Sequence, residues 1–245
     1  MGTFLYNLGR RLGPQVRKAR WIWASVTGTQ ADAVKLENEV GRDLAYEMRA
    51  QLPSGRDASA EETLRRIGCR LAGCVANRHR TFSFEAVGGG PPNAYALPGG
   101  FIFVTQSLLE LCRWDEDEVA FVLAHEMAHV IRGHAMKRIV SNSAISAASR
   151  ITPMRGPLAA WLRSTGIKLL ENAYSQDLES QADRLGVRLA AAARFDPRAA
   201  ITLLSRLARI TKPPQALDLG TYFSSHPPYD TRIRDINNVL GKHQA

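Results

Sequence analysis

The chain has 245 residues, 45% of them hydrophobic and 22% charged, so it can bury a full core as one domain with an appendage. Its formal net charge of +9 raises the question of a nucleic-acid partner. Beyond residue 31, however, lysine and arginine are interspersed with acidic residues and no nucleic-acid-binding motif occurs, so we expect no such partner.

Residues 1–31 contain five basic and no acidic residues, mixed with apolar and aromatic side chains. No apolar run long enough for a signal peptide follows these charges. Three alternatives remain open: a helix packed on the rest of the chain, an amphipathic helix on an anionic membrane surface, and a transit peptide. We therefore divide the chain into a basic amphipathic segment, residues 1–31, and one domain, residues 32–245.

The three cysteines have neither metal-site spacing nor an even number, which indicates reduced thiols and favours a reducing compartment. With no signal peptide and no membrane span in the sequence, we expect a cytoplasmic protein. Contact with an anionic membrane through residues 1–24 would make it peripheral to the membrane.

Hydrophobic periodicity predicts helices over residues 34–52 and 60–77. Alternating patterns then predict short strands over residues 81–87, 93–97 and 101–105. An exposed edge of such a small sheet can pair with an extended peptide through main-chain hydrogen bonds. The candidate substrate-binding residues at this edge are Asn93, Ala94, Tyr95 and Ala96.

A strongly apolar helix is predicted next, with Asp115 as its N-cap and Glu118 completing a capping box. It carries the HExxH pattern, in which His125 and His129 lie on one face because an α-helix turns about 100° per residue. Glu126 lies to the side, within reach of a water on a metal held by the two histidines. This arrangement is typical of zinc metallopeptidases.

A catalytic zinc needs a third protein ligand and one position left for water. His134 lies one residue short of the third histidine in the HExxHxxGxxH pattern, so we exclude that class. A carboxylate from a second helix is the other solution, and Glu179 supplies it about fifty residues on. Asp183, one helical turn later, would accept a hydrogen bond from the far ring nitrogen of a ligand histidine.

Residues 138–172 are apolar but interrupted by arginine, lysine and proline, so no stretch reaches the roughly 18 residues of a spanning helix. We expect helices and a loop that cover the site. Further helices are predicted over residues 176–193, 196–210 and 229–240.

Over residues 92–233 the chain resembles the HtpX and CAAX prenyl-protease type of zinc metallopeptidase. The resemblance is carried by motifs in one order and spacing: Asn93-Ala94-Tyr95-Ala96-Leu97-Pro98-Gly99-Gly100, the helix through His134, Glu179-Ser180-Gln181-Ala182-Asp183, Phe195-Asp196-Pro197, and Ser225-His226-Pro227-Pro228 with Arg232. The chain departs from the family pattern at Gln176, where arginine is usual, and at Arg194, where glycine is common. It also lacks the family's membrane spans.

The resemblance implies an α+β fold of the gluzincin type, mostly helical, with a small β-sheet next to the HExxH helix. It also implies a zinc metalloendopeptidase that hydrolyses peptide bonds of proteins in protein quality control. We expect one Zn²⁺ per chain on His125, His129 and Glu179. Glu126 would accept a proton from the attacking water and return it to the leaving amine.

The resemblance further places His226 facing the zinc. There it would either donate a hydrogen bond to the oxyanion or occupy the open zinc position in the resting state. Arg232 would take the donor role instead, or orient His226. The competing function is a catalytically silent protein that binds unfolded chains at a membrane surface, and the presence of Glu126 argues against it.

Overall fold

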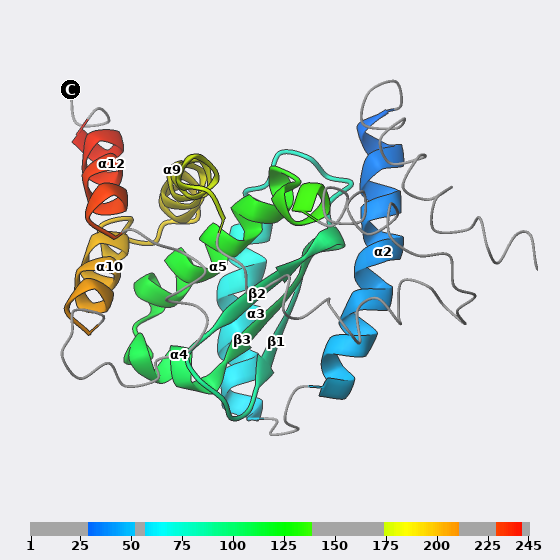
Figure 1. Ribbon diagram of the computed structural model, residues 1–245, viewed down its shortest axis with the longest axis horizontal. Coiled ribbons are helices and arrows are strands. Elements are labelled where there is room, and N and C mark those ends of the chain that lie inside the picture. Colours follow the sequence, from blue (N-terminus) through cyan, green and yellow to red (C-terminus); the bar gives the residue numbers. More distant parts are fainter. Residues whose placement is uncertain (1–28, 52–56, 139–173, 211–228, 242–245) are drawn as a thin grey trace, which may run out of the picture.

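The computed structural model describes residues 29–51, 57–138, 174–210 and 229–241. This part of the chain is mostly helical and contains one small sheet beside the HExxH helix (Figure 1). The predicted fold class is therefore confirmed.

The sheet has three strands, β1 (Ser83–Val87), β2 (Ala94–Leu97) and β3 (Phe101–Thr105), in the order β1-β3-β2. β1 runs parallel to β3, whereas β2 pairs with β3 in the antiparallel sense. The short helix η1 (Pro98–Gly100) forms the turn between β2 and β3. All three predicted strands are present, although β1 begins two residues later than predicted.

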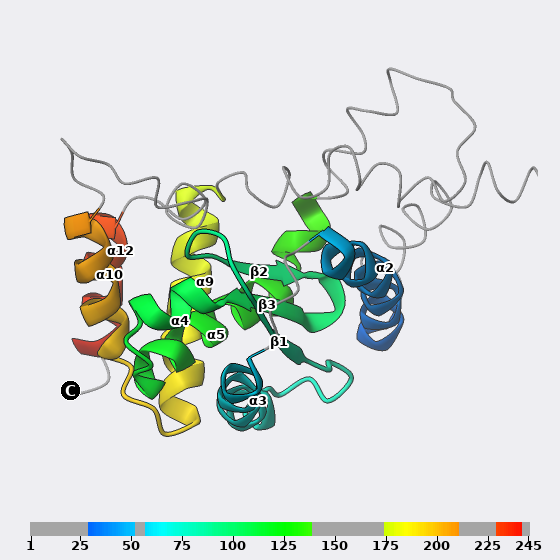
Figure 2. The ribbon, with the colours of Figure 1, turned by 90° about the horizontal axis from the view of Figure 1, so that it is seen from below.

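Helices lie on both sides of this sheet. In chain order they are α2 (Gln30–Gln51), α3 (Ala58–Gly73), α4 (Gln106–Leu111), α5 (Glu116–Ile131), α9 (Gln176–Ala192), α10 (Ala199–Ile210) and α12 (Tyr229–Gly241). Figures 1 and 2 place α2 on one side of the sheet and α5 and α9 on the other.

Side chains of β3 alternate between two hydrophobic cores, because successive residues of a strand point to opposite faces. Ile102 and Val104 belong to the larger core, which they share with buried residues of α3, α5, α9 and α10. Phe103 belongs to the smaller core, which contains the buried side of α2. The sheet therefore separates α2 from the helices that carry the metal-binding motif.

Close contact between α2 and the β2–β3 turn depends on Gly41. A Cβ atom at this position would lie 1.8 Å from the carbonyl oxygen of Pro98, so any larger residue would push the helix away. The close approach fixes α2 against the end of β2.

The prediction for α3 is wrong at its end, because the helix stops at Gly73 rather than at residue 77. The amide of Cys74 donates to the carbonyls of Leu71 and Ala72, which tightens the last turn and ends the helix. Of the residues that follow, only Val75 is buried before the chain enters the sheet, so little packing favours a longer helix.

At the start of α5 one half of the predicted capping box is confirmed and the other is wrong. The Asp115 carboxylate accepts hydrogen bonds from the amides of Asp117 and Glu118, as an N-cap should. Glu118 does not return a bond to the cap. Its carboxylate instead receives two hydrogen bonds, of 2.5 and 2.7 Å, from Arg206 on α10.

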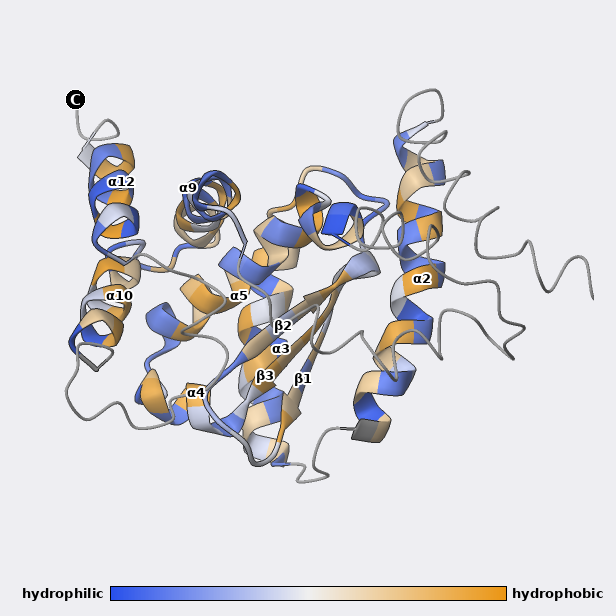
Figure 3. Cartoon of the chain, viewed as in Figure 1, coloured by the Kyte–Doolittle hydropathy of each residue, from blue (hydrophilic) through white to orange (hydrophobic). Residues whose placement is uncertain are grey.

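Hydrophilic and hydrophobic residues lie side by side along α2 and α12, as expected for helices with one buried face (Figure 3). Within the described residues, none of the helices combines the length and the apolar character needed to cross a membrane.

Candidate metal centre

Three predicted metal ligands lie together inside the domain. His125 and His129 come from α5, and Glu179 comes from the first turn of α9. The two histidine Nε2 atoms are 3.1 Å apart. Oε2 of Glu179 lies 3.5 Å from Nε2 of His125, and Oε1 lies 3.4 Å from Nε2 of His129. These residues form the one His/Cys/Asp/Glu group with metal-ligand geometry among the described residues, and all three are buried.

The spacing of these atoms fits a zinc ion. Zinc takes nitrogen and oxygen ligands at about 2.0–2.2 Å in a tetrahedron, whose corners are then about 3.3–3.6 Å apart. The 3.1 Å between the two Nε2 atoms and the 3.4 and 3.5 Å contacts to the two oxygens of Glu179 lie at or close to that range. Three corners are supplied by the protein, which leaves the fourth for water or substrate.

The two ligand helices approach each other closely at Gly186 of α9. A Cβ atom here would lie 3.2 Å from the amide nitrogen of His125. Every residue of α5 from Glu118 to Val130 is buried, so the helix that carries both histidines is held on all sides. This packing fixes the ligand positions in advance.

Asp183 contacts the outer nitrogen of His125. Its Oδ1 lies 2.9 Å from Nδ1 of His125, so the ring donates its Nδ1 proton to the carboxylate and presents the Nε2 lone pair toward Glu179. Burial opposes a charge on His125. The hydrogen bond to Asp183 and the charges of Glu179 and Asp183 nevertheless raise the pKa of this histidine above its ordinary value of 6.5.

Arg232 from α12 binds both carboxylates. Its Nε and one terminal nitrogen donate to Asp183 at 2.8 and 2.7 Å, and its other terminal nitrogen lies 3.3 Å from Glu179. Burial alone would raise the pKa of Asp183, but the charge and hydrogen bonds of Arg232 hold it well below the usual range. Asp183 is therefore ionised, and Arg232 offsets part of the negative charge of the centre.

Two residues that the sequence did not identify as functional contact His129. Nδ1 of His134 lies 3.0 Å from Nδ1 of His129, and the ring of Tyr174 stacks on His129 with 4.1 Å between ring centroids. Burial lowers the pKa of His134 to about 4, so its ring is neutral at neutral pH. The only sequence signal was a further histidine near the end of the HExxH helix.

Comparison with known proteins places this arrangement in a family. The sequence profile of Peptidase family M48 matches residues 58–240, which is most of the chain and contains all three ligands. The chain belongs to peptidase family M48. The family resemblance inferred from the motifs is thereby confirmed.

Individual M48 relatives support the same assignment. The mitochondrial metalloendopeptidase OMA1 of Schizosaccharomyces pombe is 37% identical over 159 residues, which cover 63% of this chain and 45% of that protein. The beta-barrel assembly-enhancing protease of Yersinia pestis is 28% identical over 229 residues, or 86% of this chain and 46% of that protein. The mitochondrial metalloendopeptidase OMA1 of Danio rerio is 29% identical over 160 residues, which cover 60% of this chain and 33% of that protein. The chain thus spans about half the length of the first two relatives, and less of the third.

Glu126, the general base expected of an M48 peptidase, lies directly after His125 on α5 and is 2% exposed. It is thus beside the metal ligands on the same rigid helix. Its catalytic role stays a prediction.

Three of the four candidate substrate-binding residues, Ala94, Tyr95 and Ala96, lie on β2, and Asn93 directly precedes it. β2 is in contact with α5 and has β3 as its partner among the described strands. The carbonyl of Asn93 accepts a hydrogen bond from the Thr105 amide, so the main chain of Asn93 faces β3. Because this orientation alternates along a strand, the main-chain groups of Ala94 and Ala96 face away from β3. The Ala94 amide already donates to the Asn93 side chain at 2.9 Å, which leaves the Ala96 amide as the outward donor.

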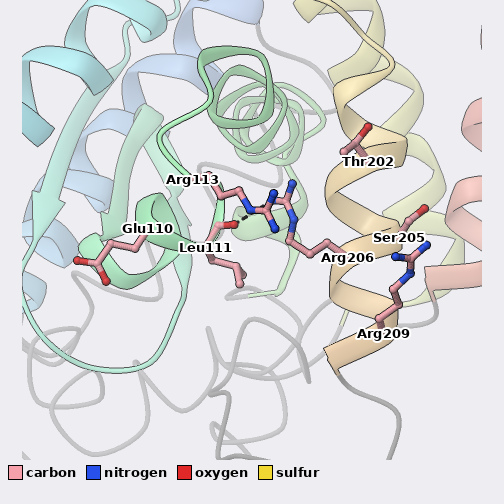
Figure 4. Close-up of a pocket in the computed structure, with 7 residues that line it drawn as sticks. All are labelled: Glu110, Leu111, Arg113, Thr202, Ser205, Arg206 and Arg209. Atoms are coloured by element: carbon pink, nitrogen blue, oxygen red, sulfur yellow. Dashed lines mark hydrogen bonds between the residues drawn. The ribbon is translucent and has the colours of Figure 1, made fainter.

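A groove of about 690 Å³ lies between α4 and α10 (Figure 4), and none of the predicted site residues lines it. It is lined by Glu110, Leu111, Arg113, Thr202, Ser205, Arg206 and Arg209. Arg206 is bound to Glu118 and to the Leu111 carbonyl, and Glu110 contributes a further negative charge. We assign no function to this groove.

Some sequence predictions lie outside the described residues. They are the membrane contact of residues 1–24, the covering segment within 139–173, and the position of His226. The division of the chain at residue 31 likewise stays a prediction.

Proposed function

We propose that this M48 chain is a zinc metalloendopeptidase that binds one Zn²⁺ on His125, His129 and Glu179 and hydrolyses peptide bonds of proteins. The observation that carries the proposal is the buried ligand cluster. The two Nε2 atoms lie 3.1 Å apart, and Glu179 places one carboxylate oxygen 3.5 Å from His125 and the other 3.4 Å from His129, which suits tetrahedral zinc with one open position. The family resemblance supports a role in protein quality control.

Each residue of the centre has a separate role in the proposed peptide hydrolysis. Zinc held by His125, His129 and Glu179 would supply a Lewis acid for activating water near neutral pH and for polarising the scissile carbonyl. Glu126 accepts the proton of the attacking water and returns it to the leaving amine. Asp183 holds His125 in the tautomer that offers Nε2, and Arg232 keeps Asp183 ionised. His226 remains the candidate oxyanion donor, with the alternative role of a resting-state zinc ligand.

The first experiment removes and restores the metal. The purified full chain is expected to contain one zinc per chain and to cleave casein. Cleavage should stop after dialysis against a chelator and return when zinc is added, because the metal supplies the Lewis acid. Zinc binding without cleavage would instead favour the silent protein-binding alternative. A chain without zinc would contradict the proposed metal centre.

We also propose that the outward edge of β2 pairs with the extended substrate through the main chain of Ala96. Ala96→Pro removes that amide donor, so kcat/KM for a peptide is expected to fall about threefold to tenfold, the effect of one net hydrogen bond. Ala96→Ser keeps the amide and is the matched control. Zinc content and thermal unfolding of both variants check that the fold is kept.

A modified substrate tests the second hydrogen bond of the same strand pairing on the unaltered protein. Replacing one peptide bond of the substrate by an ester removes the substrate N–H that would donate to the outward carbonyl of Ala96, and at one position this should lower kcat/KM by a similar factor. The proposal would be contradicted if Ala96→Pro and the control had equal kcat/KM and if no ester position changed the kcat/KM of the unaltered protein. The substrate would then bind elsewhere.

A further inference from the structure

His134 faces the metal ligand His129 across a short turn. α5 ends at Ile131, and Gly133 has φ +69°, a left-handed conformation that favours glycine and reverses the chain. The helical segment 134–138 then begins with His134. The rings of His129 and His134 meet edge to face at 71°, and both residues are at most 1% exposed.

The direction of the hydrogen bond follows from the other nitrogen of His129. That Nε2 atom faces Nε2 of His125 at 3.1 Å and the Glu179 carboxylate at 3.4 Å, so a metal at this centre requires its lone pair. A neutral imidazole carries one proton, which must then be on Nδ1. The partner of that proton is Nδ1 of His134, 3.0 Å away, which accepts the bond and carries its own proton on Nε2.

The two ligand histidines are therefore held by different groups. His125 donates to a carboxylate, Asp183, whereas His129 donates to a neutral imidazole. The face of the His129 ring is covered by Tyr174. The Arg138 guanidinium in turn lies over the Tyr174 ring, 3.3 Å from its centroid. An uncharged acceptor orients His129 without adding negative charge to a centre that already contains Glu179 and Asp183.

We propose that His134 is a positioning residue for the zinc ligand His129: it accepts the Nδ1 proton of His129 and so directs Nε2 of that ring to the metal. This inference rests on the proposed zinc centre. It assigns a role to a histidine that is not itself one of the three proposed ligands, because its Nδ1 faces the outer nitrogen of His129 rather than the ligand atoms.

A matched pair of substitutions tests the proposal. In asparagine the Oδ1 atom is bonded to Cγ, as Nδ1 is in histidine, so His134→Asn keeps an acceptor close to the original place. His134→Leu puts a methyl group there and leaves the buried Nδ1 proton of His129 without its acceptor. Removing such an outer partner typically weakens metal binding 10- to 100-fold. We expect that loss for His134→Leu and less than about threefold for His134→Asn, the rescue that an acceptor predicts.

Zinc dissociation constants measured by chelator competition on the full chain give the main readout. The absorption spectrum of the Co²⁺-substituted protein gives a second, because it reports ligand geometry independently of cleavage. Thermal unfolding of the metal-free variants shows whether they are folded, and His134→Ala replaces the leucine variant if that one is not.

The outcomes separate this inference from the proposed function. Wild-type zinc affinity and Co²⁺ spectrum in folded His134→Leu or His134→Ala would overturn the positioning role alone. Equal loss in the asparagine and leucine variants would also overturn it, because the acceptor would not be the decisive feature. A wild-type chain that binds no zinc would overturn the metal centre and the inference with it.

Discussion

Glu126→Gln is expected to lower the turnover of peptide cleavage at least about a hundredfold while zinc stays bound, the low end for loss of a general base. Glutamine nearly keeps the shape of this buried side chain but cannot accept the proton of the attacking water. Zinc stoichiometry and kcat should therefore respond independently, which a general loss of folding would not produce.

The matched control for this variant is Glu116→Gln on the same helix. Glu116 is exposed at the start of α5 and pairs with Arg66, with 2.6 Å between the charged atoms, so its replacement changes the helix terminus without reaching the centre. The control is expected to cleave casein at the wild-type rate. Retained turnover in Glu126→Gln would contradict the proposed mechanism.

Glu179→Ala is expected to abolish zinc binding or to weaken it strongly. The centre keeps only two ligands from α5, and the guanidinium of Arg232, 3.3 Å from the carboxylate in the wild type, then faces the metal position without that negative charge. Both changes disfavour a bound cation. We expect the zinc affinity to fall by more than the roughly 10- to 100-fold that loss of an outer partner costs, with activity falling in parallel.

Zinc analysis after gel filtration and chelator competition measure this effect. Asp177→Ala is the control, because Asp177 lies in the same first turn of α9 but is exposed. It should keep zinc and activity. Full zinc content and cleavage in Glu179→Ala would show that the third ligand lies elsewhere.

Local regularities of the chain determined much of the fold. The period of the α-helix was sufficient to place His125 and His129 on one face, and alternation was sufficient to predict three strands to within about two residues. The Asp115 N-cap was also predictable, because its bonds go to amides two and three residues away. Such features depend on neighbours in sequence, so the sequence contains the information.

A long-range partner accounts for the error at Glu118. Glu118 has the spacing of a capping box, yet it pairs with Arg206, 88 residues away, because α10 packs beside the start of α5. Nothing in the sequence near Glu118 indicates that partner. The pairing of Arg232 with Asp183, 49 residues apart, is of the same kind.

The sequence by itself determined the ligand types, their spacing on α5 and the family to which they point. Asp183 was also predicted as the partner of a ligand histidine, but only the tertiary structure decided that this histidine is His125 and that His134 contacts the other. The close approach of α9 at Gly186 brings Glu179 to the two histidines, and the turn at Gly133 brings His134 against His129. The physical reason is that ring orientation and tautomer depend on hydrogen bonds between separate segments, and packing rather than sequence spacing sets those distances.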